Sequence, residues 1–420
     1  MLNNNFDSEW WEKFLSETNQ MSKATIFKDC ITDHEIDDLN TFILDVITAL
    51  SKLRTIEYGY RVFINNHKLD ENEMNMIYNN PPLAGESIEA WCERLFEKRE
   101  FGIIINSAER FNAELSNVMA IRSKPLFDKL GFPIEGVNFT VFIGNYSHTP
   151  IGIHQDMPGE NVLHYHLGPG KKSMYIWENE LFEKLEKKIN NKNIEKFLPY
   201  AEEYSFEKGD LYFMPQGVYH VGKQENFSVA LTFWFYNHSK KRILEKLNTM
   251  LLEQYMDDID ELLPPDTSSL DDLSNIKNIL SIYKIPKELE YVSFQDLLAE
   301  AYRDLRYTIA SNAGYRTSLF PKDQNFELYE HDIVEIEKPY QLLYTESNNK
   351  QSLYVYVRGT KLVFNNFYDI KRIIDKLNEG TKVKISDFHK VIEEKWDNET
   401  ILYILSLLFK HHGIKIINPI

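Results

Sequence analysis

Residues 209–220 read GDLYFMPQGVYH, and this stretch decides how the middle of the chain folds. Leu211–Met214 is an apolar run of strand length, Pro215 and Gly217 mark a turn, and His220 opens the next strand. Similar strands, separated by Gly, Pro and Asn, recur from about residue 134 to residue 237. Many short strands with such punctuation predict a β-sandwich or barrel. The expected strands are Val137–Ile143, Gly152–Asp156, Val162–Leu167, Ser173–Trp177, Gly209–Pro215 and Ser228–Phe235.

A histidine and an aspartate lie two positions apart upstream of this stretch, at His154 and Asp156. In a strand, positions i and i+2 point to one face, so this spacing delivers an imidazole and a carboxylate to one metal ion. His220 is the candidate third ligand. Two histidines and one carboxylate leave three coordination positions open, which suits non-haem Fe(II) with a co-substrate and O₂. Taken alone, the spacing also fits a surface histidine beside a solvated aspartate.

The segment Phe139–Phe235 resembles the JmjC/cupin-type Fe(II)- and 2-oxoglutarate-dependent oxygenases. The matching residues are His154-x-Asp156, Gly170-Lys171-Lys172 before the strand Ser173–Trp177, Gly209-Asp210, Pro215-x-Gly217-x-x-His220 and the closing strand Leu231–Phe235. The resemblance implies a double-stranded β-helix core. It also implies that His154, Asp156 and His220 hold Fe(II), with 2-oxoglutarate and O₂ as co-substrates. The expected reaction is hydroxylation of a protein, peptide or RNA-borne substrate.

The wider layout resembles the bacterial ribosomal-oxygenase-like group of that family, on the order of elements more than on residues. It implies an α+β chain with four parts. These are a helical N-terminal extension packing on the barrel (1–100), a JmjC-type barrel (101–238), a helical linker or dimerisation region (239–330) and a winged-helix-like domain (331–420). A homodimer formed through a leucine-rich helix at Lys241–Leu263 follows from the same layout.

Lys172 is the expected partner of the distal carboxylate of 2-oxoglutarate, by its position in the resembling motif. Burying an unpaired charge in a barrel costs much free energy, so one inward cation with a hydroxyl donor is the simplest solution. Lys171 would point the other way, and the alternative is an exposed Lys172 in a turn. Thr232 and Trp234 share one face of the last strand and are expected to line the pocket, Thr232 beside the co-substrate. Plain packing is the alternative for both.

His164 and His166 depart from the resembling pattern, in which apolar or amide residues are more usual. Both imidazoles would point to the same side of a strand. They are candidates for binding 2-oxoglutarate or substrate, or for adding a metal ligand that would favour another metal. The alternative is a pair of hydrogen-bonded core or surface histidines.

Helical and mixed patterns flank the strand-rich region. Apolar residues recur at helical spacing over Ile36–Lys52, with Asp33 as the expected N-cap. The remaining expected helices are Ile88–Lys98, Leu181–Lys192, Lys241–Leu263, much of 270–310, Asn366–Leu377, Ser386–Lys395 and Glu399–His411. Further strands are expected at Tyr60–Ile64, Phe101–Ile105, Leu353–Val357 and Ile414–Ile417, with a linker over 264–269.

Composition narrows the class of partner and the compartment. The 420 residues include 47 basic and 64 acidic side chains, a net charge of −17, which disfavours general affinity for nucleic acid or anionic membranes. The negative charge remains compatible with a cationic protein or peptide as the partner. Cys30 and Cys92 build neither a disulfide framework nor a thiolate zinc site. No signal peptide is recognised, and the longest apolar run, Ile401–Phe409, is too short to span a bilayer. We therefore expect a cytoplasmic protein.

The C-terminal region is a poor electrostatic match for DNA. Lys371, Arg372 and Lys376 share an expected helix with Asp369 and Asp375, so the charges nearly balance. DNA binding is therefore not expected, and packing or peptide docking is the favoured role. Two functions follow for the whole chain. One is an oxygenase that hydroxylates a ribosomal protein or a ribosomally made precursor peptide. The other is a catalytically inactive cupin-like binding or scaffolding protein.

Overall fold

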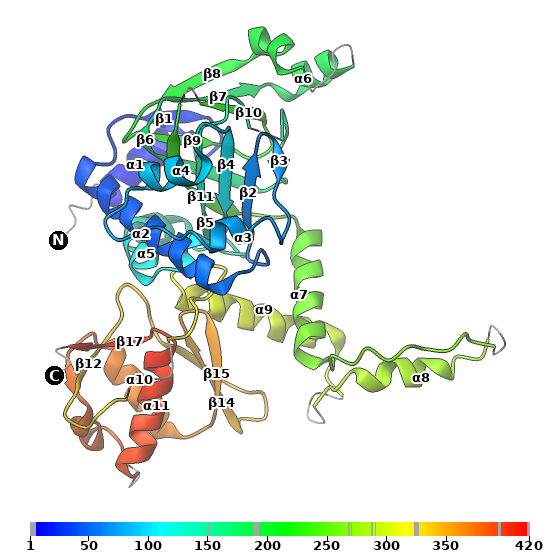
Figure 1. Ribbon diagram of the computed structural model, residues 1–420. Coiled ribbons are helices and arrows are strands. Elements are labelled where there is room, and N and C mark those ends of the chain that lie inside the picture. The colour runs from blue at the N-terminus through cyan, green and yellow to red at the C-terminus, as the bar shows by residue number, and fades with distance from the viewer. Residues whose placement is uncertain are drawn as a thin grey trace.

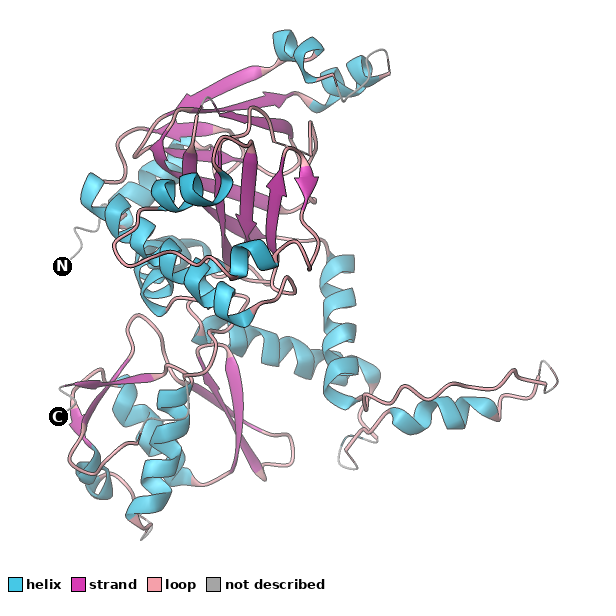
Figure 2. Ribbon diagram, in the orientation of Figure 1, coloured by secondary structure: helices cyan, strands magenta, loops and turns pink. Residues whose placement is uncertain are grey.

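The computed structural model describes residues 6–149, 151–187, 193–224, 226–267, 269, 271–286, 289, 291–322, 327–393 and 396–417. The chain is α+β: a sheet-rich body lies above a smaller C-terminal body, and helices join the two at one side (Figures 1 and 2). No helix among these residues has both the length and the apolar composition that a membrane crossing requires.

An eight-stranded antiparallel sheet forms the wall of the larger body. Its order is β1 (Thr25–Phe27), β9 (Leu211–Met214), β6 (Glu160–Pro169), β11 (Ser228–Tyr236), β5 (Val137–Gly144), β4 (Phe101–Ile105), β2 (Tyr60–Ile64) and β3 (His67–Lys68). The central strand β11 pairs with β5 on one side and β6 on the other. Thr232 therefore lies opposite Thr140 in β5 and opposite His164 in β6. This register places three polar side chains side by side in the middle of the sheet.

A second antiparallel sheet consists of β10 (Tyr219–Gln224), β7 (Lys172–Trp177) and β8 (Glu202–Phe206). His154 forms an antiparallel bridge with His220 on the free edge of β10. Residues from both sheets line one cavity, which therefore lies between the sheets and contains the candidate ligands His154, Asp156 and His220. The helix expected at Leu181–Lys192 is α6 (Asn179–Glu186), and residues 188–192 lie outside the described part. The 3₁₀ turns η2 (Ile194–Lys196) and η3 (Leu198–Tyr200) follow it.

Helices cover the outer face of the large sheet (Figure 1). They are α1 (Ser8–Glu17), α2 (Asp33–Leu53), α3 (Asn75–Tyr78), α4 (Ile88–Phe96) and α5 (Ala113–Leu130), with the 3₁₀ turn η1 (Ala108–Arg110) before α5. Their apolar faces and the sheet share one core, to which Trp11, Ile43, Trp91, Phe139 and Phe233 belong. This core makes the large sheet a rigid wall behind the cavity.

Helix α2 confirms the predicted apolar stripe but begins earlier than predicted. Its N-cap is Thr32 and not Asp33, because Thr32 and Glu35 form a capping box. The Thr32 amide donates to Glu35 Oε2 at 2.8 Å, and the Glu35 amide donates to Thr32 Oγ1 at 3.4 Å. Asp33 instead occupies the first turn, where its negative charge interacts favourably with the helix dipole and stabilises the helix.

The middle region contains less helix than the sequence predicts. Helix α7 (Lys240–Tyr255) ends well before Leu263, and α9 (Phe294–Ser311) packs against it. Acidic residues crowd the chain directly after Tyr255, and negative charge at a helix C-terminus opposes the helix dipole. The described residues of 257–282 instead form an arm that leaves the body and carries the short helix α8 (Asn275–Ile279) and the 3₁₀ turn η4 (Leu280–Ile282) (Figure 1).

The C-terminal body has a core of its own, which includes Val334, Leu353, Ile373, Leu405 and Leu408. Two three-stranded sheets and two helices build it. The sheets are β16 (Val383–Lys384), β12 (Ile333–Ile336), β17 (Ile414–Ile417) and β13 (Leu343–Glu346), β14 (Ser352–Val357), β15 (Thr360–Asn365); the helices are α10 (Tyr368–Asn378) and α11 (Asn398–Lys410). The predicted helix Ser386–Lys395 is instead the 3₁₀ segment η6 (Ile385–Lys390); residues 394 and 395 lie outside the described part.

Candidate metal centre and its cavity

Backbone pairing brings the two candidate histidines together. The His154 amide donates to the His220 carbonyl at 3.1 Å, and the His220 amide donates back at 2.8 Å. Gly152, at φ +78°, turns the chain into this pairing, a backbone conformation that glycine adopts without strain. Asp156 follows two residues after His154. The predicted strand Gly152–Asp156 is wrong: this segment forms only a single bridge, at His154, and that bridge to the edge of the small sheet fixes the cluster.

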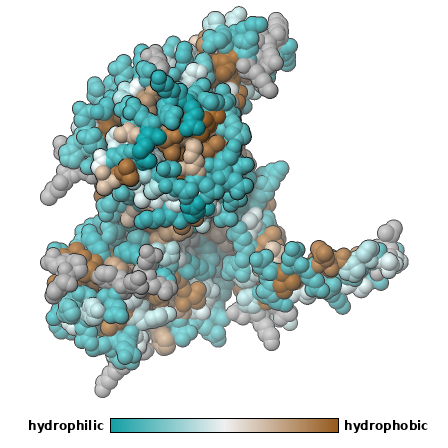
Figure 3. All heavy atoms as spheres, in the orientation of Figure 1, coloured by the Kyte–Doolittle hydropathy of each residue, from teal (hydrophilic) through white to brown (hydrophobic). Residues whose placement is uncertain are grey.

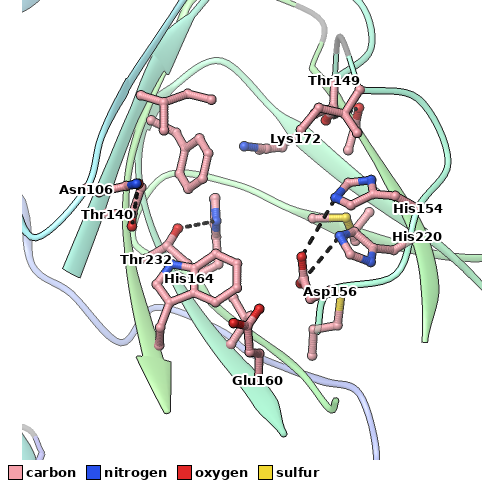
Figure 4. Close-up of a pocket in the computed structure, with 18 of the residues that line it drawn as sticks. Asn106, Thr140, Thr149, His154, Asp156, Glu160, His164, Lys172, His220 and Thr232 are labelled. Atoms are coloured by element: carbon pink, nitrogen blue, oxygen red, sulfur yellow. Dashed lines mark hydrogen bonds and ion pairs between the residues drawn. The ribbon is translucent and has the colours of Figure 1, made fainter. Parts of the chain in front are cut away.

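The ligand atoms of His154, Asp156 and His220 all lie within 4.8 Å of one another. His154 Nε2 is 3.8 Å from Asp156 Oδ1, and His220 Nε2 is 3.7 Å from Asp156 Oδ2. The two imidazole rings lie 4.3 Å apart, centre to centre. Figure 4 shows all three side chains converging on one point. Among the described residues this is the one group of three or more His, Cys, Asp or Glu side chains close enough to hold an ion.

Backbone carbonyls orient both imidazoles. His154 Nδ1 lies 2.9 Å from the Gly152 carbonyl, and His220 Nδ1 lies 3.1 Å from the Val218 carbonyl. A carbonyl only accepts, so each Nδ1 carries the proton and each Nε2 keeps its lone pair toward Asp156. This arrangement, in which the second ring nitrogen is fixed by a hydrogen bond, is typical of histidines that bind metals.

Burial changes the pKa values of two cluster residues, His220 and Asp156. Desolvation lowers the pKa of His220 to about 3, so this imidazole is neutral at pH 7. Desolvation also raises the pKa of Asp156, and charge on His154 opposes that rise. Asp156 Oδ2 is buried without a hydrogen-bond donor. A buried oxygen that lacks a donor, beside two nitrogen lone pairs, fits a divalent transition metal.

The cluster opens into a cavity of about 340 Å³ between the two sheets. Figure 4 shows Lys172 entering it from the small sheet, and Thr140, Thr232 and His164 from the large sheet. Trp234 also lines the cavity, and its Nε1 is buried without an acceptor. The predicted common face of Thr232 and Trp234 is therefore the face turned toward the cavity.

Lys172 is a buried cation that makes no ion pair within the described part of the chain. It is 5% exposed, and its Nζ lies 5.7 Å from the centre of the Phe142 ring. Desolvation lowers the pKa of this ammonium to about 8. Lys171 is exposed, as the strand alternation predicts. A carboxylate entering the cavity would restore the charge pairing that Lys172 lacks.

Gly222 leaves room between the metal cluster and Lys172. A Cβ at this position would lie 3.0 Å from Thr149 Oγ1 and 3.8 Å from Lys172 Cε. Gly222 is two residues after His220 on the same strand face, and both line the cavity. The space beside the cluster thus fits a small ligand that reaches from the cluster to Lys172.

The two histidines of β6 differ in what they face. His164 lines the cavity; its Nδ1 lies 3.1 Å from Thr232 Oγ1 and its Nε2 is buried without a partner. His166 does not line the cavity, and its Nε2 donates to the Gly170 carbonyl at 2.6 Å. Neither is within ligand distance of the metal cluster. Burial lowers the pKa of both rings, that of His166 to about 4.

Several cavity residues escape sequence reasoning. Arg61, Asn106, Asn138 and Glu160 all line the cavity. Arg61 lies between two fully buried residues of β2, so strand alternation alone would place it on the opposite face from that core. Glu160 alternates with Val162 and His164 along β6, so alternation places it on the cavity face. It accepts from the Met157 amide at 3.2 Å, and one of its oxygens is 3.6 Å from His238 Nε2.

Comparison with known proteins gives remote likenesses in structure. No family model and no curated protein sequence matches the chain. Structures of the ribosomal oxygenase YcfD from Escherichia coli match 97% of this chain and 98% of theirs, at 13% identity and a TM-score of 0.47. The complex of YcfD with cobalt and 2-oxoglutarate matches at 12% identity and a TM-score of 0.47. The complex with cobalt and succinic acid matches at 13% and 0.48.

Proposed function

We propose that this protein is an Fe(II)- and 2-oxoglutarate-dependent oxygenase that hydroxylates a side chain of a protein or peptide. The observation that carries the proposal is the pairing of two features in one cavity. Two imidazole Nε2 atoms and a buried carboxylate converge on one point, and a buried ammonium without an ion pair lies in the same cavity. The first suits a ferrous ion, and the second suits a dicarboxylate co-substrate.

The finer architecture belongs to the proposal. The strands β9, β6, β11 and β5 face the small sheet, with the His154 segment on its edge, in the manner of a double-stranded β-helix. Residues 1–100 would extend this barrel, 101–238 would form it, 239–330 would link and dimerise, and 331–420 would be winged-helix-like. The separate core of the C-terminal body supports the last of these divisions.

Each residue has a stated task in this proposal. His154, Asp156 and His220 hold the ion through Nε2, a carboxylate oxygen and Nε2. Lys172 neutralises the distal carboxylate of 2-oxoglutarate, and Thr232 lies beside it. Trp234 and Glu160 offer a wall to the substrate side chain. With both bound, Fe(II) and 2-oxoglutarate supply the activation of O₂ and the hydroxylation of a C–H bond, with succinate and CO₂ as co-products.

A basic protein or peptide is the proposed substrate, either a ribosomal protein or a ribosomally made precursor peptide. The net charge of −17 supports a cationic partner and disfavours DNA. On α10 the basic side chains are already paired: Lys371 with Glu346 at 2.5 Å, Arg372 with Glu393 and Lys376 with Glu379 at 2.5 Å. The buried free thiols of Cys30 and Cys92 suit the cytoplasm. A neighbouring gene for a short precursor peptide or a ribosomal protein would identify the substrate.

The test is co-substrate binding and turnover in the purified protein. Anaerobic addition of Fe(II) and 2-oxoglutarate should give a weak visible charge-transfer band, and candidate peptides should stimulate succinate release. His154→Ala and Asp156→Ala should abolish both, whereas Lys171→Ala, at the exposed neighbour of Lys172, should leave both intact. Turnover that survives in the first two variants would refute the metal assignment. Absence of the band in the unaltered protein would favour the inactive cupin-like binding protein.

A further inference from the structure

His164 has a feature that the proposed metal and Lys172 roles do not use. Its ring is 4% exposed, lies in the centre of β6 and lines the cavity, yet Nε2 has no hydrogen-bond partner. A buried polar nitrogen without a partner is unfavourable, because it has lost its hydrogen bonds to water, unless a ligand supplies one. Its direction is set by the sheet, because Thr232 lies directly opposite in β11 and Thr232 Oγ1 contacts Nδ1 at 3.1 Å.

The contact with Thr232 permits one tautomer that turns His164 into a donor. When the Thr232 hydroxyl donates to Nδ1, the proton of the neutral ring lies on Nε2. Burial and the nearby charge of Lys172 lower the pKa of His164 well below its usual range, so the ring stays neutral. A neutral imidazole in this tautomer offers one N–H to the cavity that Lys172 also enters (Figure 4).

We propose that His164 Nε2–H donates the second hydrogen bond to the carboxylate that Lys172 neutralises, so that the two residues together select a dicarboxylate co-substrate. This inference rests on the proposed function. It assigns His164 a place at the end of the co-substrate remote from the ion, and it makes Thr232 a positioning residue that acts through the His164 ring.

The charges in the cavity favour a neutral donor at this position. A divalent ion, a dianionic co-substrate and the charged side chains that line the cavity (Asp156, Glu160, Lys172 and Arg61) cancel one another. A further cation would leave an excess buried charge, which costs more free energy than a dipole. A neutral N–H adds a charge-assisted hydrogen bond without changing the balance. An imidazole that burial keeps neutral meets this requirement.

His166 provides a matched control in the same strand. It lies two residues further on the same side, and its ring is 6.0 Å from the His164 ring, centre to centre. Both rings pack against Phe206, at 5.3 Å for His164 and 5.4 Å for His166. His166 does not line the cavity, and the Gly170 carbonyl accepts from its Nε2. Replacing either ring therefore disturbs similar packing, but only His164 reaches the cavity.

The experiment measures ligand binding to the Mn(II)-loaded protein by calorimetry, with 2-oxoglutarate and with 2-oxobutyrate, which lacks the distal carboxylate. His164→Phe should weaken 2-oxoglutarate binding by about tenfold to a hundredfold, as expected for a lost hydrogen bond to a charged group. It should leave 2-oxobutyrate binding unchanged. His164→Gln, whose amide nitrogen takes the place of Nε2, should stay within about threefold of the unaltered protein. His166→Phe should change neither ligand.

Three results would overturn the inference. The first is that His164→Phe binds 2-oxoglutarate as tightly as the unaltered protein does. The second is that it loses affinity for both keto acids equally while its Mn(II) affinity and melting temperature stay unchanged. The third is that His164→Gln does not restore the affinity for 2-oxoglutarate. A separate readout is the ¹⁵N spectrum of the histidine rings, in which 2-oxoglutarate should fix the His164 proton on Nε2. If the unaltered protein bound neither keto acid with metal present, the proposed function would fail first.

Discussion

Burial of the Lys172 ammonium sets a condition on binding at the scale of a single residue. The group needs its proton to attract a carboxylate, but its surroundings lower the pKa to about 8. In the free protein, the proton is therefore lost from about pH 8 upward. A bound carboxylate reverses this effect, because an opposite charge close by favours the charged form. Co-substrate affinity and the protonation of Lys172 are thus linked.

The linkage predicts a pH dependence. Below pH 8 the affinity of the Mn(II)-loaded protein for 2-oxoglutarate should be constant, and above it the dissociation constant should rise by about tenfold per pH unit. Lys172→Arg should flatten this profile, because a guanidinium keeps its charge throughout the range. Calorimetric titrations between pH 6.5 and 9.5 test the expectation. Parallel profiles in the two proteins would assign the titration to another group.

The residues of the candidate site differ in how well the sequence predicts them. His154 and Asp156 are two apart in an extended segment, so their common side follows from local geometry. His220 is a candidate because it follows a strand and the Pro215–Gly217 turn, but its long-range pairing with His154 is seen only in the fold. Glu160 and Asn138 enter the cavity by strand alternation, because Val162 and Thr140, two residues further along β6 and β5, line it as well. Which face of each strand meets the cavity follows only from the pairing of the whole sheet.

Strand β10 presents the candidate metal ligand His220 and the glycine Gly222 on the same face. His220 and Gly222 alternate with residues that point away, and both line the cavity. A side chain on Gly222 would approach Thr149 and Lys172, and this glycine has no positive φ that its backbone would require. The absence of a side chain at this position therefore keeps space free in the cavity, and the strand backbone does not require it.

Gly222→Val should block the co-substrate and spare the metal. The added branches would occupy the space between His220 and Lys172, so 2-oxoglutarate binding should weaken by more than about a hundredfold, while β-branched side chains suit a strand. Calorimetry with Mn(II) and with 2-oxoglutarate separates the two effects. Lys223→Val, on the opposite face of the same strand, serves as the control. Unchanged 2-oxoglutarate affinity in Gly222→Val would show that the ligand lies elsewhere.

The turn before β9 depends on a buried carboxylate. Asp210 is 2% exposed and accepts from the Asp29 amide at 3.1 Å and the Glu207 amide at 2.8 Å. Lys28 Nζ lies 2.6 Å from the same side chain, but the lysine side chain is 56% exposed. The Asp29 bond ties the end of β1 to the start of β9, and the Glu207 bond closes the turn between β8 and β9. Strand β9 leads into the Pro215–Gly217 turn and His220.

Loss of this carboxylate should destabilise the larger body. Asp210→Ala leaves the Asp29 and Glu207 amides without their carboxylate acceptor, and it should lower the free energy of unfolding by about 3 kcal/mol. Lys28→Met removes only a solvent-screened ion pair and should cost less than about 1 kcal/mol. Urea unfolding followed by tryptophan fluorescence measures both. Equal losses would mean that the ion pair, and not the backbone bonds, holds the turn.

Element type was more predictable than element length. The stripe of α2 and the strands β5, β7, β9 and β11 follow from periodicity, because one face of each meets a core. Helix α5 was not predicted: it contains Pro125 and buries polar residues such as Arg122, so its pattern is weak. The Arg122 guanidinium pairs with the buried Glu35 at 2.5 Å, a tertiary contact that sequence periodicity does not reveal.

At the scale of the whole molecule, a few buried polar contacts join the two bodies. Ser116 Oγ in α5 lies 2.9 Å from Tyr340 OH and 2.9 Å from Arg358 Nη2. The Arg358 guanidinium stacks 3.3 Å from the centre of the Tyr340 ring, and Asn117 donates to Glu337 at 3.0 Å. The order of the parts along the chain is readable from the sequence. Their docking is not, because it depends on single side chains more than 200 residues apart.

The described residues of the arm at 257–282 leave a group of apolar side chains uncovered. Eight large hydrophobic side chains of residues 256–280 are exposed: Met256, Ile259, Leu262, Leu263, Leu273, Ile276, Ile279 and Leu280. Figure 3 shows apolar patches on the arm where it projects from the body. The arm also carries seven acidic residues against one basic, whereas exposed Arg306 lines a hollow with Tyr302 on α9. These features fit an arm that packs on α9 of a second copy.

This arrangement predicts a dimer whose formation depends on the arm. Light scattering should give a mass of about twice 49.6 kDa for the unaltered protein. Introducing charge through Leu263→Asp with Ile276→Lys should yield a monomer, because each charge would have to be buried at the interface. Arg306→Glu should weaken association by repelling the acidic arm. Tyr403→Glu, at an exposed position on α11, should leave the mass unchanged. Mn(II) binding should persist in every variant, because the metal cluster lies in the larger body, away from the substituted positions. A monomeric mass for the unaltered protein would exclude the dimer.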